Sequence, residues 1–596
     1  MSAAAQDSDA LGEKVYQQHC AVCHDQTNTR IPSQDQLRTL PAARILHTLD
    51  FGVMMSIAYP LKRTEREAVA KYLGTANASD ETPPSAFCQE RGAGFSNHAL
   101  ANWNGWSPDA SNSRFQTTTA SRLTPEQVAR LKVKWAFGFP GDVIAFAAPT
   151  VFRGSLFAGG ASGHVQALNA TTGCTQWTFQ ADGPVRMAVV VAQLGSNYVA
   201  LFGDQLGSFY ALDARTGRLL WRRRIDEHEA TRLTASPAIL NDTVFVGAAS
   251  WEETRALDPH YPCCTFRGSV SALLISDGTP IWKSYLVEPP AKRGVNAAET
   301  PSFGPSGVSV WAAPTVDKKR KLLYVTTGDN YSLPASAMSD SVVALDARTG
   351  RIVWSQQFTH GDAYNSSCPG GANCPSSPGP DHDFGASAIL VNFHGRGILL
   401  AGQKAGIVYA LDPDHGGTML WKTRVGRGSA LGGIEWGMAS DGERLYAAVS
   451  DVVPMGASLV GPRALGSSTF DPARGGGLTA LKLDDGARAW FAPAQPCEPP
   501  RPGCSPGQPA ALSAIPGVVF SGSMDGHLRA FASMDGHTIW DFDAVREYST
   551  VNGVAARGGS LDGAGPVVVD GMVYVTSGSS RFGGMPGNVL IAFGAN

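Results

Sequence analysis

Two cysteines and a histidine near the N-terminus stand at the spacing that attaches a haem. The residues are Cys20-Ala21-Val22-Cys23-His24. At this spacing two thioethers reach adjacent vinyl groups on one porphyrin edge, and the imidazole that follows reaches the iron. The alternative is a redox-active cysteine pair beside an incidental histidine, but no βαβ pattern surrounds the motif. The spacing therefore predicts a covalent c-type haem (heme c) held by Cys20, Cys23 and His24.

A methionine further along the chain is expected to complete the coordination of the iron. Met54 and Met55 lie shortly before a helical pattern at Glu65–Leu73. A thioether ligand raises the potential of a haem into the range used for electron transfer. We favour Met54 as the axial ligand, with Met55 and then His47 as alternatives. Methionines also fill apolar cores, so a structural role for both stays open.

The elements that must position this motif are helical. Apolar residues recur at helical spacing over Leu11–Gln18 and over Glu65–Leu73. We therefore expect a small all-α haem domain at residues 1–76, which looks like a class I cytochrome c. A polar, proline-interrupted linker is expected at residues 77–86.

The rest of the chain, residues 87–596, repeats one pattern. Most units place Ala-Leu or Ala-Phe ten or eleven positions before a tryptophan, with a glycine between them. A unit of this length matches a four-stranded blade. The first unit lacks the strand before its tryptophan, and Leu590–Phe593 at the other end supplies one. We therefore predict an eight-bladed β-propeller closed by pairing of its two ends. The repeated tryptophans are Trp135, Trp177, Trp221, Trp282, Trp354, Trp421, Trp490 and Trp540.

Composition excludes two classes of function. Lys and Arg number 48 against 51 Asp and Glu, so there is no basic surplus for binding nucleic acid. No apolar run approaches the roughly 18 residues of a membrane span.

The pairs Cys368/Cys374 and Cys497/Cys504 are flanked by Pro and Gly and predict small disulfide-closed loops. Disulfides indicate an oxidising compartment, so we expect a secreted, periplasmic protein whose signal peptide has been removed from this sequence.

The tryptophan repeat and the haem motif together resemble the pyrroloquinoline quinone (PQQ) dehydrogenases, and among these the quinohaemoproteins. Here the haem domain precedes the propeller, an order similar to that of the polyvinyl alcohol dehydrogenases. The segment Cys263–Val270 adds to this match. The resemblance implies PQQ and calcium in the propeller channel and oxidation of an alcohol.

The resemblance also implies residues for the metal and the catalytic base. Glu252 follows a strand that ends in Gly, as the calcium-ligating Glu of the family does. After Thr327-Gly328, register favours Asp329 as the next ligand, whereas residue type favours Asn330. The catalytic base corresponds to Asp383, which also ligates calcium, with Asp381 as the runner-up.

Contacts to PQQ can be carried over in the same way. Trp311 is expected to stack under the quinone, and a vicinal disulfide between Cys263 and Cys264 is implied on its other face. The same disulfide in the small-alcohol enzymes lies earlier in the chain, so stacking by this pair stays open. Elimination then leaves Cys88 and Cys174 to bridge each other. The other expected contacts are Arg186, Thr234, Lys404 and, as a weaker candidate, Trp436.

The expected activity is oxidation of secondary hydroxyls of polyvinyl alcohol, with electrons leaving through the haem to an external acceptor such as a soluble cytochrome c. One alternative keeps the cofactors but takes small primary or secondary alcohols as substrates. Another is a non-enzymatic propeller scaffold with a cytochrome attached. A scaffold has no reason to carry channel carboxylates, so it ranks last.

Overall fold

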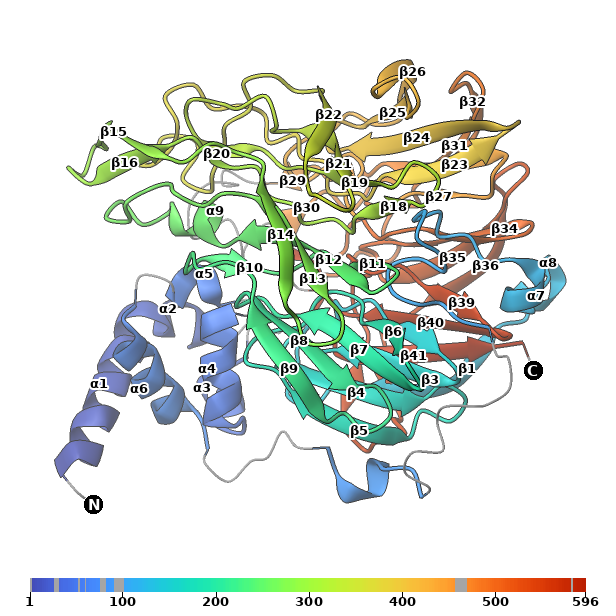
Figure 1. Ribbon diagram of the computed structural model, residues 1–596. Coiled ribbons are helices and arrows are strands. Elements are labelled where there is room, and N and C mark those ends of the chain that lie inside the picture. Colours follow the sequence, from blue (N-terminus) through green and yellow to red (C-terminus); the bar gives the residue numbers. More distant parts are fainter. Residues whose placement is uncertain are drawn as a thin grey trace.

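The computed structural model describes residues 3–25, 32–51, 54–58, 61–75, 82–89, 101–455, 469–579 and 583–595. Its N-terminal part is a small helical unit, as predicted (Figure 1). α1 packs against α6, and the two helices cross so closely at Gly12 that a Cβ there would lie 2.4 Å from the carbonyl oxygen of Ala68. The helices are α1 (Ala3–His19), α2 (Ala21–His24), α3 (Gln34–Leu37), α4 (Ala42–Phe51), α5 (Met55–Ala58) and α6 (Arg63–Leu73).

The rest of the chain forms an eight-bladed β-propeller, which confirms the predicted fold class (Figure 1). Each blade is an antiparallel sheet of four main strands, and the first strands of neighbouring blades contact one another around the channel. Four blades are β2–β5 (Thr150–Phe152, Ser155–Gly159, His164–Asn169, Thr175–Gln180), β6–β9 (Val190–Leu194, Asn197–Gly203, Ser208–Asp213, Leu219–Arg224), β11–β14 (Ala238–Leu240, Thr243–Ser250, Ser269–Leu274, Pro280–Tyr285) and β18, β19, β21, β22 (Thr315–Asp317, Leu322–Thr326, Ser341–Asp346, Ile352–Gln357). The other four are β23–β26 (Ile389–Phe393, Arg396–Gln403, Ile407–Asp412, Thr418–Arg424), β27, β28, β31, β32 (Ala439–Ser440, Arg444–Val449, Gly477–Lys482, Arg488–Pro493), β33–β36 (Ser513–Ile515, Val518–Gly522, His527–Ala532, Thr538–Asp543) and β39, β40, β41, β1 (Val567–Val569, Met572–Ser577, Val589–Gly594, Lys132–Gly138).

The last blade closes the ring as the sequence predicted. β1, from the start of the propeller, pairs antiparallel with β41 at its end, from Lys132 opposite Gly594 to Gly138 opposite Val589. This pairing removes the free edges that an open ring of sheets would leave. Short elements in the connections are η1 (Pro84–Ala86), α7 (Thr118–Ser121), α8 (Pro125–Val128), α9 (Glu252–Arg255), β10 (Thr231–Arg232), β15 (Ala291–Val295), β16 (Pro301–Gly304), β17 (Ser306–Gly307), β20 (Asn330–Ser332), β29 (Pro454–Met455), β30 (Thr469–Phe470), β37 (Glu547–Tyr548) and β38 (Ala556–Arg557).

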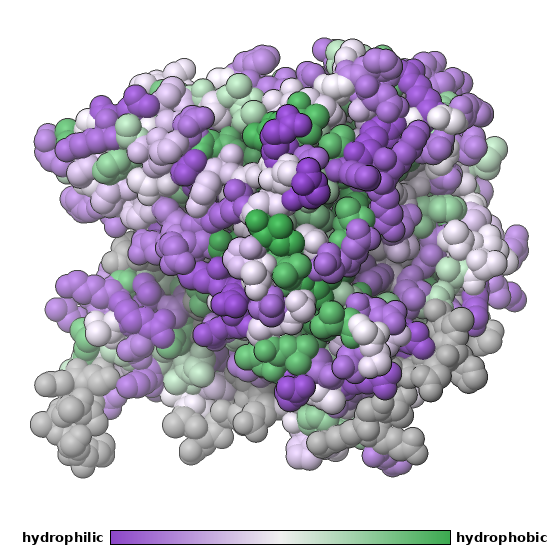
Figure 2. All heavy atoms as spheres, viewed as in Figure 1, coloured by the Kyte–Doolittle hydropathy of each residue, from purple (hydrophilic) through white to green (hydrophobic). Residues whose placement is uncertain are grey.

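The outer faces of the blades are largely hydrophilic, as Figure 2 shows. Apolar side chains gather near the middle of that view, over the outermost strands β9 and β14, where Leu219, Leu220 and Ile281 are exposed. Exposed apolar residues are normal on a protein surface, much of which is contributed by apolar atoms. Among the described residues, no helix combines the length and the apolar character needed to cross a bilayer.

Seven of the eight repeated tryptophans dock against a glycine of the next blade, whereas Trp540 donates from Nε1 to the carbonyl oxygen of Leu131. The indole of Trp177 donates from Nε1 to the carbonyl oxygen of Ala214 at 3.0 Å. Gly217 of the same turn has a φ of 73°, and a Cβ there would lie 2.7 Å from the Trp177 ring. The turn itself is capped by Asp213, whose Oδ1 accepts from the backbone of Arg215 and Thr216. The repeat is therefore an inter-blade packing motif.

Replacing Gly217 with alanine is expected to destabilise the propeller by about 3 kcal/mol. The left-handed backbone costs a non-glycine residue about 1–2 kcal/mol, and crowding the Trp177 ring adds about 1–2 kcal/mol more. Gly395→Ala is the matched control, because Gly395 has a φ of 83° but nothing within 4 Å of the added methyl. Urea midpoints should separate the two variants, and equal losses would contradict the packing role of Gly217.

A segment of residues 101–121, called the strap, lies along the free edges of the innermost strands. Its backbone forms hydrogen bonds with the first strands of several blades. The bonded pairs are Trp103 and Val151, Ser111 and Leu390, and Ser113 and Ser440. Further bonds join the strap to the blades that begin with β6, β18 and β33. An innermost strand has unpaired backbone groups facing the channel, and the strap pairs many of them. The strap therefore fills one end of the channel.

Arg114 anchors the strap at its centre. Its guanidinium is buried and donates to the carbonyl oxygens of Leu512 and Trp106 and to Ser513 Oγ. It also lies 5.3 Å from the Trp103 ring and 4.6 Å from the Trp106 ring. Burial lowers the pKa of Arg114 to about 9, which still leaves the group charged at neutral pH. A buried cation is tolerated here because several carbonyl dipoles and two aromatic faces surround it.

Candidate functional site

The connections at the other end of the channel enclose a cavity of about 150 Å³. The connections leading into seven of the eight innermost strands reach this cavity, and so do several of the connections between a blade's second and third strands. Trp311 precedes β18, Asp329 follows β19, Asp381 and Asp383 precede β23, and Lys404 follows β24. Residues that lie far apart in the sequence therefore meet at one site.

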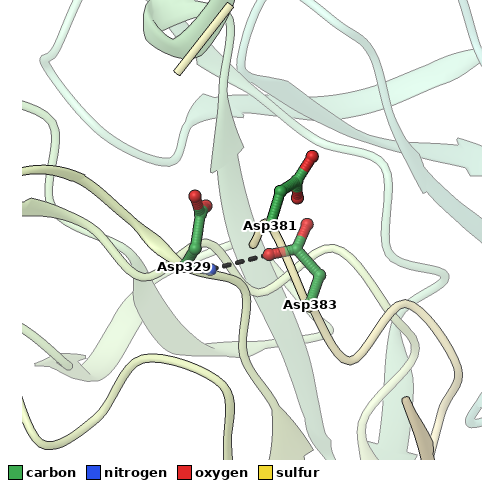
Figure 3. A group of neighbouring side chains, drawn as sticks. All are labelled: Asp329, Asp381 and Asp383. Carbon is green, nitrogen blue, oxygen red and sulfur yellow. Dashed lines mark hydrogen bonds between the residues drawn. The ribbon is translucent and has the colours of Figure 1, made fainter. Parts of the chain in front are cut away.

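Three aspartates form the acidic side of the cavity (Figure 3). Oxygens of Asp329, Asp381 and Asp383 lie within 4.8 Å of one another. Asp383 Oδ1 accepts the backbone N–H of Asp329 at 2.7 Å. Lys404 Nζ lies 2.9 Å from Asp381 Oδ1 and 3.1 Å from Asp383 Oδ2. Asp329 Oδ2 is buried and has no hydrogen-bond partner, so one carboxylate oxygen is left to meet a ligand.

Burial and crowding disturb the charges of this group. Burial, together with the neighbouring carboxylates of Asp383 and Asp381, raises the pKa of Asp329 well above its usual range. Burial also raises the pKa of Asp381, although Lys404 opposes the shift. Burial disfavours the charged form of Lys404, but Asp381 and Asp383 outweigh it, so the Lys404 pKa is raised. Three crowded carboxylates with one ammonium group favour an additional cation.

Two tryptophans and an arginine form an aromatic side of the cavity. The rings of Trp311 and Trp436 lie 5.5 Å apart and nearly perpendicular. The guanidinium carbon of Arg186 lies 4.4 Å from the Trp436 ring, and Trp436 Nε1 donates to Asp562 at 2.6 Å. Lys404 Nζ lies 5.7 Å from the Trp311 ring. The structure thus brings together the predicted Arg186, Trp311, Lys404 and Trp436 around one space.

Thr234 lies in a second, smaller cavity of about 40 Å³. Its Oγ1 donates to the carbonyl oxygen of Trp311 at 3.4 Å. Arg186, Trp311 and Trp436 line both cavities, and Trp106 of the strap lines the smaller one. Thr234 therefore lies beside the main cavity and supports the backbone of Trp311.

Glu252, expected to ligate calcium, does not line the cavity. It is fully buried, and its carboxylate accepts the backbone N–H groups of Thr265 and Phe266, both at 2.7 Å. The Tyr261 hydroxyl donates to the same carboxylate at 3.0 Å. The neighbouring Glu253 lines the cavity instead. Glu252 therefore holds the segment after the vicinal cysteines, and its lone pairs are already used.

Asn330, the alternative to Asp329, also turns away from the three aspartates. Its Nδ2 donates to the carbonyl oxygen of Ser306, and its Oδ1 accepts the N–H of Ser336, both at 2.7 Å. Both polar atoms of the side chain are satisfied within the protein. Of the two neighbours, the structure therefore brings only Asp329 into the acidic group.

All four expected disulfides are present, including the Cys88–Cys174 bridge. They place the chain in an oxidising, extracytoplasmic compartment. Cys263 and Cys264 are buried. The carbonyl oxygen of Cys263 accepts the N–H of Phe303, and the N–H of Cys264 donates to the carbonyl oxygen of Phe303. Neither cysteine is among the residues that line the two cavities. Of the predicted PQQ contacts, the structure therefore does not bring the vicinal pair to the lining of either cavity.

Sequence reasoning missed four charged residues of the cavity wall, namely Arg232, Glu253, Glu435 and Asp562. Arg232 lies 4.4 Å above the Trp251 ring, and its Nε is buried with no hydrogen-bond partner. Burial lowers the pKa of Arg232 and raises that of Glu435 to about 8. Arg232, Glu253 and Glu435 each lie within two residues of a predicted contact, so proximity to Thr234, Glu252 and Trp436 was the available signal. Asp562 has no predicted contact near it in the sequence.

In the helical unit, one ring nitrogen of His24 is available to bind a metal. His24 is buried, and its Nδ1 lies 2.7 Å from the carbonyl oxygen of Pro32. A carbonyl only accepts, so Nδ1 carries the proton and Nε2 has a free lone pair. Cys20 is half-buried, Cys23 is exposed, and neither takes part in a disulfide. Met54 packs at the edge of the helical core, whereas the side chains of His47 and Met55 lie outside the described residues.

Comparison with known proteins agrees with this arrangement. The PQQ family described as glucose/ethanol/alcohol dehydrogenase, β-propeller domain, matches residues 103–420. The family described as outer membrane protein assembly factor BamB matches residues 404–589. A polyvinylalcohol dehydrogenase of Pseudomonas sp. is 39% identical over 98% of this chain and 93% of its own length. The polyvinylalcohol dehydrogenase of Sphingopyxis sp. (strain 113P3) is 38% identical over 98% of this chain and 92% of its own length.

The fold also matches solved structures. The quinohemoprotein alcohol dehydrogenase of Comamonas testosteroni aligns with a TM-score of 0.59 at 18% identity, covering 84% of this chain and 81% of that one. This likeness concerns the propeller fold. The match to the family model, the 39% identity to a relative over nearly the whole chain and the residues of the cavity all agree. The chain therefore belongs to the PQQ-dependent alcohol dehydrogenase family.

Proposed function

We propose that the chain oxidises secondary hydroxyls of polyvinyl alcohol to ketones in the periplasm, using PQQ, calcium and a covalent c-type haem. The two relatives that match nearly the whole chain are polyvinylalcohol dehydrogenases. The observation that carries the proposal is the cavity where Asp329, Asp381 and Asp383 face Trp311 and Lys404.

The residues of the main cavity fit PQQ and a hard cation. PQQ is a flat anion, and the wall supplies an aromatic face at Trp311 and cationic side chains at Arg186, Arg232 and Lys404. The unpartnered Nε of Arg232 and Oδ2 of Asp329 are buried polar atoms that need a ligand. Carboxylate oxygens are the donors that Ca²⁺ prefers. We propose Asp329, Asp381 and Asp383 as calcium ligands, in place of Glu252 and Asn330.

The helical unit fits a c-type haem in the same sense. Cys20 and Cys23 are the thiols for the two thioethers, and His24 presents Nε2 because Pro32 holds Nδ1. We propose these residues and Met54 as the haem attachment and its axial ligands, within a haem domain at residues 1–76 and a linker at 77–86.

Each side chain then has a defined task. When bound, PQQ accepts a hydride and the haem relays single electrons to an external acceptor such as a soluble cytochrome c. Asp383 Oδ2 faces the cavity, and we assign it as the base that takes the hydroxyl proton of the substrate. Asp383 Oδ1 is fixed by the Asp329 N–H, which orients the carboxylate. Lys404 balances the negative charge that three aspartates bring into the cavity.

The direct test is the visible spectrum of the protein with PQQ and calcium, before and after polyvinyl alcohol is added. We expect haem reduction only when PQQ, calcium and polymer are present together. Reduction by short alcohols but not by polymer would select the small-alcohol alternative. A haem that stays oxidised with every alcohol would contradict dehydrogenase activity and favour a scaffold role.

Replacing Met54 with alanine is expected to shift the spectrum of the reduced haem and to lower its potential, because a thioether ligand favours the reduced iron. Electron exit to the acceptor should then slow, while substrate oxidation in the propeller persists with an artificial acceptor. Met55→Ala is the control and should leave spectrum and potential unchanged. The reverse pattern would exchange the two assignments.

A further inference from the structure

One side of the main cavity is apolar and belongs to no blade core. Val452, Phe470 and Met524 line the cavity and pack into a cluster of their own, against which Leu431 packs. They come from three connections of two neighbouring blades: Leu431 precedes β27, Val452 and Phe470 lie between β28 and β31, and Met524 lies between β34 and β35. We call these four residues the apolar wall.

The apolar wall and the three aspartates line the same cavity but come from different blades. The aspartates lie on the connections after β19 and before β23, whereas the wall comes from the blades that follow β26. One part of the cavity therefore presents carboxylates and Lys404, and another presents the apolar side chains of the wall. A molecule that satisfies both carries a hydroxyl on a hydrocarbon chain.

We infer that the apolar wall binds the carbon chain on either side of the reacting carbinol and so selects extended secondary alcohols over short ones. The inference rests on the proposed function. When the hydroxyl of a secondary alcohol points at Asp383, two carbon chains extend from its carbinol carbon. These chains displace water from the apolar wall. Propan-2-ol has one methyl on each side, whereas a polymer segment continues in both directions. The longer chain therefore gains contacts that the shorter one lacks.

The side chain of Met524 is the best place to test this inference. Its backbone is held independently, because the Met524 N–H donates to Gly507 and the Met524 carbonyl accepts from Ser560 Oγ. Replacement by glutamine keeps the length and changes only the polarity at the cavity. Met534 provides a matched control, since it is also a methionine of the same blade but is 69% exposed.

The experiment measures kcat and KM of the PQQ- and calcium-loaded protein for propan-2-ol, nonan-5-ol and polyvinyl alcohol. We expect Met524→Gln to raise KM for nonan-5-ol and polymer about tenfold with kcat nearly unchanged, since contacts with one or two methylenes are worth about this factor. Propan-2-ol should change less than twofold. Met524→Leu should behave like the parent, and Met534→Gln should change nothing. Quenching of tryptophan fluorescence by polymer gives the same comparison without turnover.

The outcomes separate this inference from the function on which it rests. Equal losses for short and long alcohols would mean that the wall shapes the cavity and does not contact substrate. Unchanged values for all three alcohols in Met524→Gln and in Phe470→Ala would also overturn the inference, while leaving the activity intact. A parent protein that oxidises none of the alcohols would instead overturn the proposed function, and the inference with it.

Discussion

Replacing Asp383 with asparagine is expected to lower kcat for polyvinyl alcohol by about a thousandfold. A positioned general base contributes about 10²–10⁴ in rate, and an amide cannot take the hydroxyl proton. The substitution keeps the size of the side chain, and an amide oxygen can still accept the Asp329 N–H. Lys404 keeps its contact with Asp381 at 2.9 Å. The oxidised haem spectrum and the melting temperature should therefore stay close to those of the parent.

Asp381→Asn is the matched control, because it removes a carboxylate from the same group of three. We expect it to weaken calcium binding about tenfold or more and to recover most activity when calcium is raised. Calcium titrations followed by tryptophan fluorescence give the affinity, and turnover at saturating calcium gives the chemistry. If Asp383→Asn turns over normally while Asp381→Asn is inactive at saturating calcium, the base is Asp381.

Replacing Arg114 with methionine is expected to destabilise the propeller by about 4 kcal/mol. The substitution leaves the carbonyl groups of Leu512 and Trp106 and the hydroxyl of Ser513 without their donor in a buried place. Each buried unsatisfied group costs about 1–3 kcal/mol. Because the strap pairs the inner edges of several blades, the loss should appear as a lower midpoint of the whole unfolding transition.

Arg122→Met supplies the control for this second variant. Arg122 lies just beyond the strap, its side chain is more than half exposed, and its contact with Asp570 is an ion pair at 3.4 Å. Exposed pairs of this kind contribute about 0–1 kcal/mol. Urea unfolding followed by tryptophan fluorescence compares the two variants. A similar, small change for both would refute the anchoring role of Arg114.

The parts of the fold that repeat could be predicted from the sequence. Blades share one local problem, docking a tryptophan over a glycine turn, and that solution recurs with a countable period in the sequence. The closure of the ring followed from the split first unit and was confirmed by the pairing of β1 with β41. The haem motif is likewise local, because its geometry depends on five consecutive residues.

Side-chain direction in the cavity connections could not be predicted in the same way. Glu252 and Glu253 begin the short helix α9, where successive side chains point about 100° apart. Asn330 begins β20, so it and Asp329 point to opposite sides. Choosing between neighbours requires the position of the whole connection, which the blades set. The carry-over from the family therefore led to segments that line the cavity, but at one of them the cavity is lined by Glu253 and not by Glu252.

The strap gave no usable signal because its partners are distant. Residues 101–121 show neither alternation nor helical spacing, and their hydrogen bonds go to strands as far away as Ala514. Only after the blades are arranged in a ring do the inner edges exist that these residues pair. The same dependence explains why the apolar wall, built from three separate connections, was not anticipated.

The Cys88–Cys174 bridge limits the length of the segment that connects the helical unit to the propeller. It fastens the chain to the first blade 13 residues after Thr75, the last described residue of the helical unit. Those residues can extend at most about 45 Å. Opening the bridge would move the attachment point on to the strap and roughly double that reach. The local concentration of one unit beside the other, of millimolar order for a short tether, would then fall. With the proposed haem in the helical unit, an oxidising surrounding would thus favour electron transfer between the two units as well as the stability of the fold.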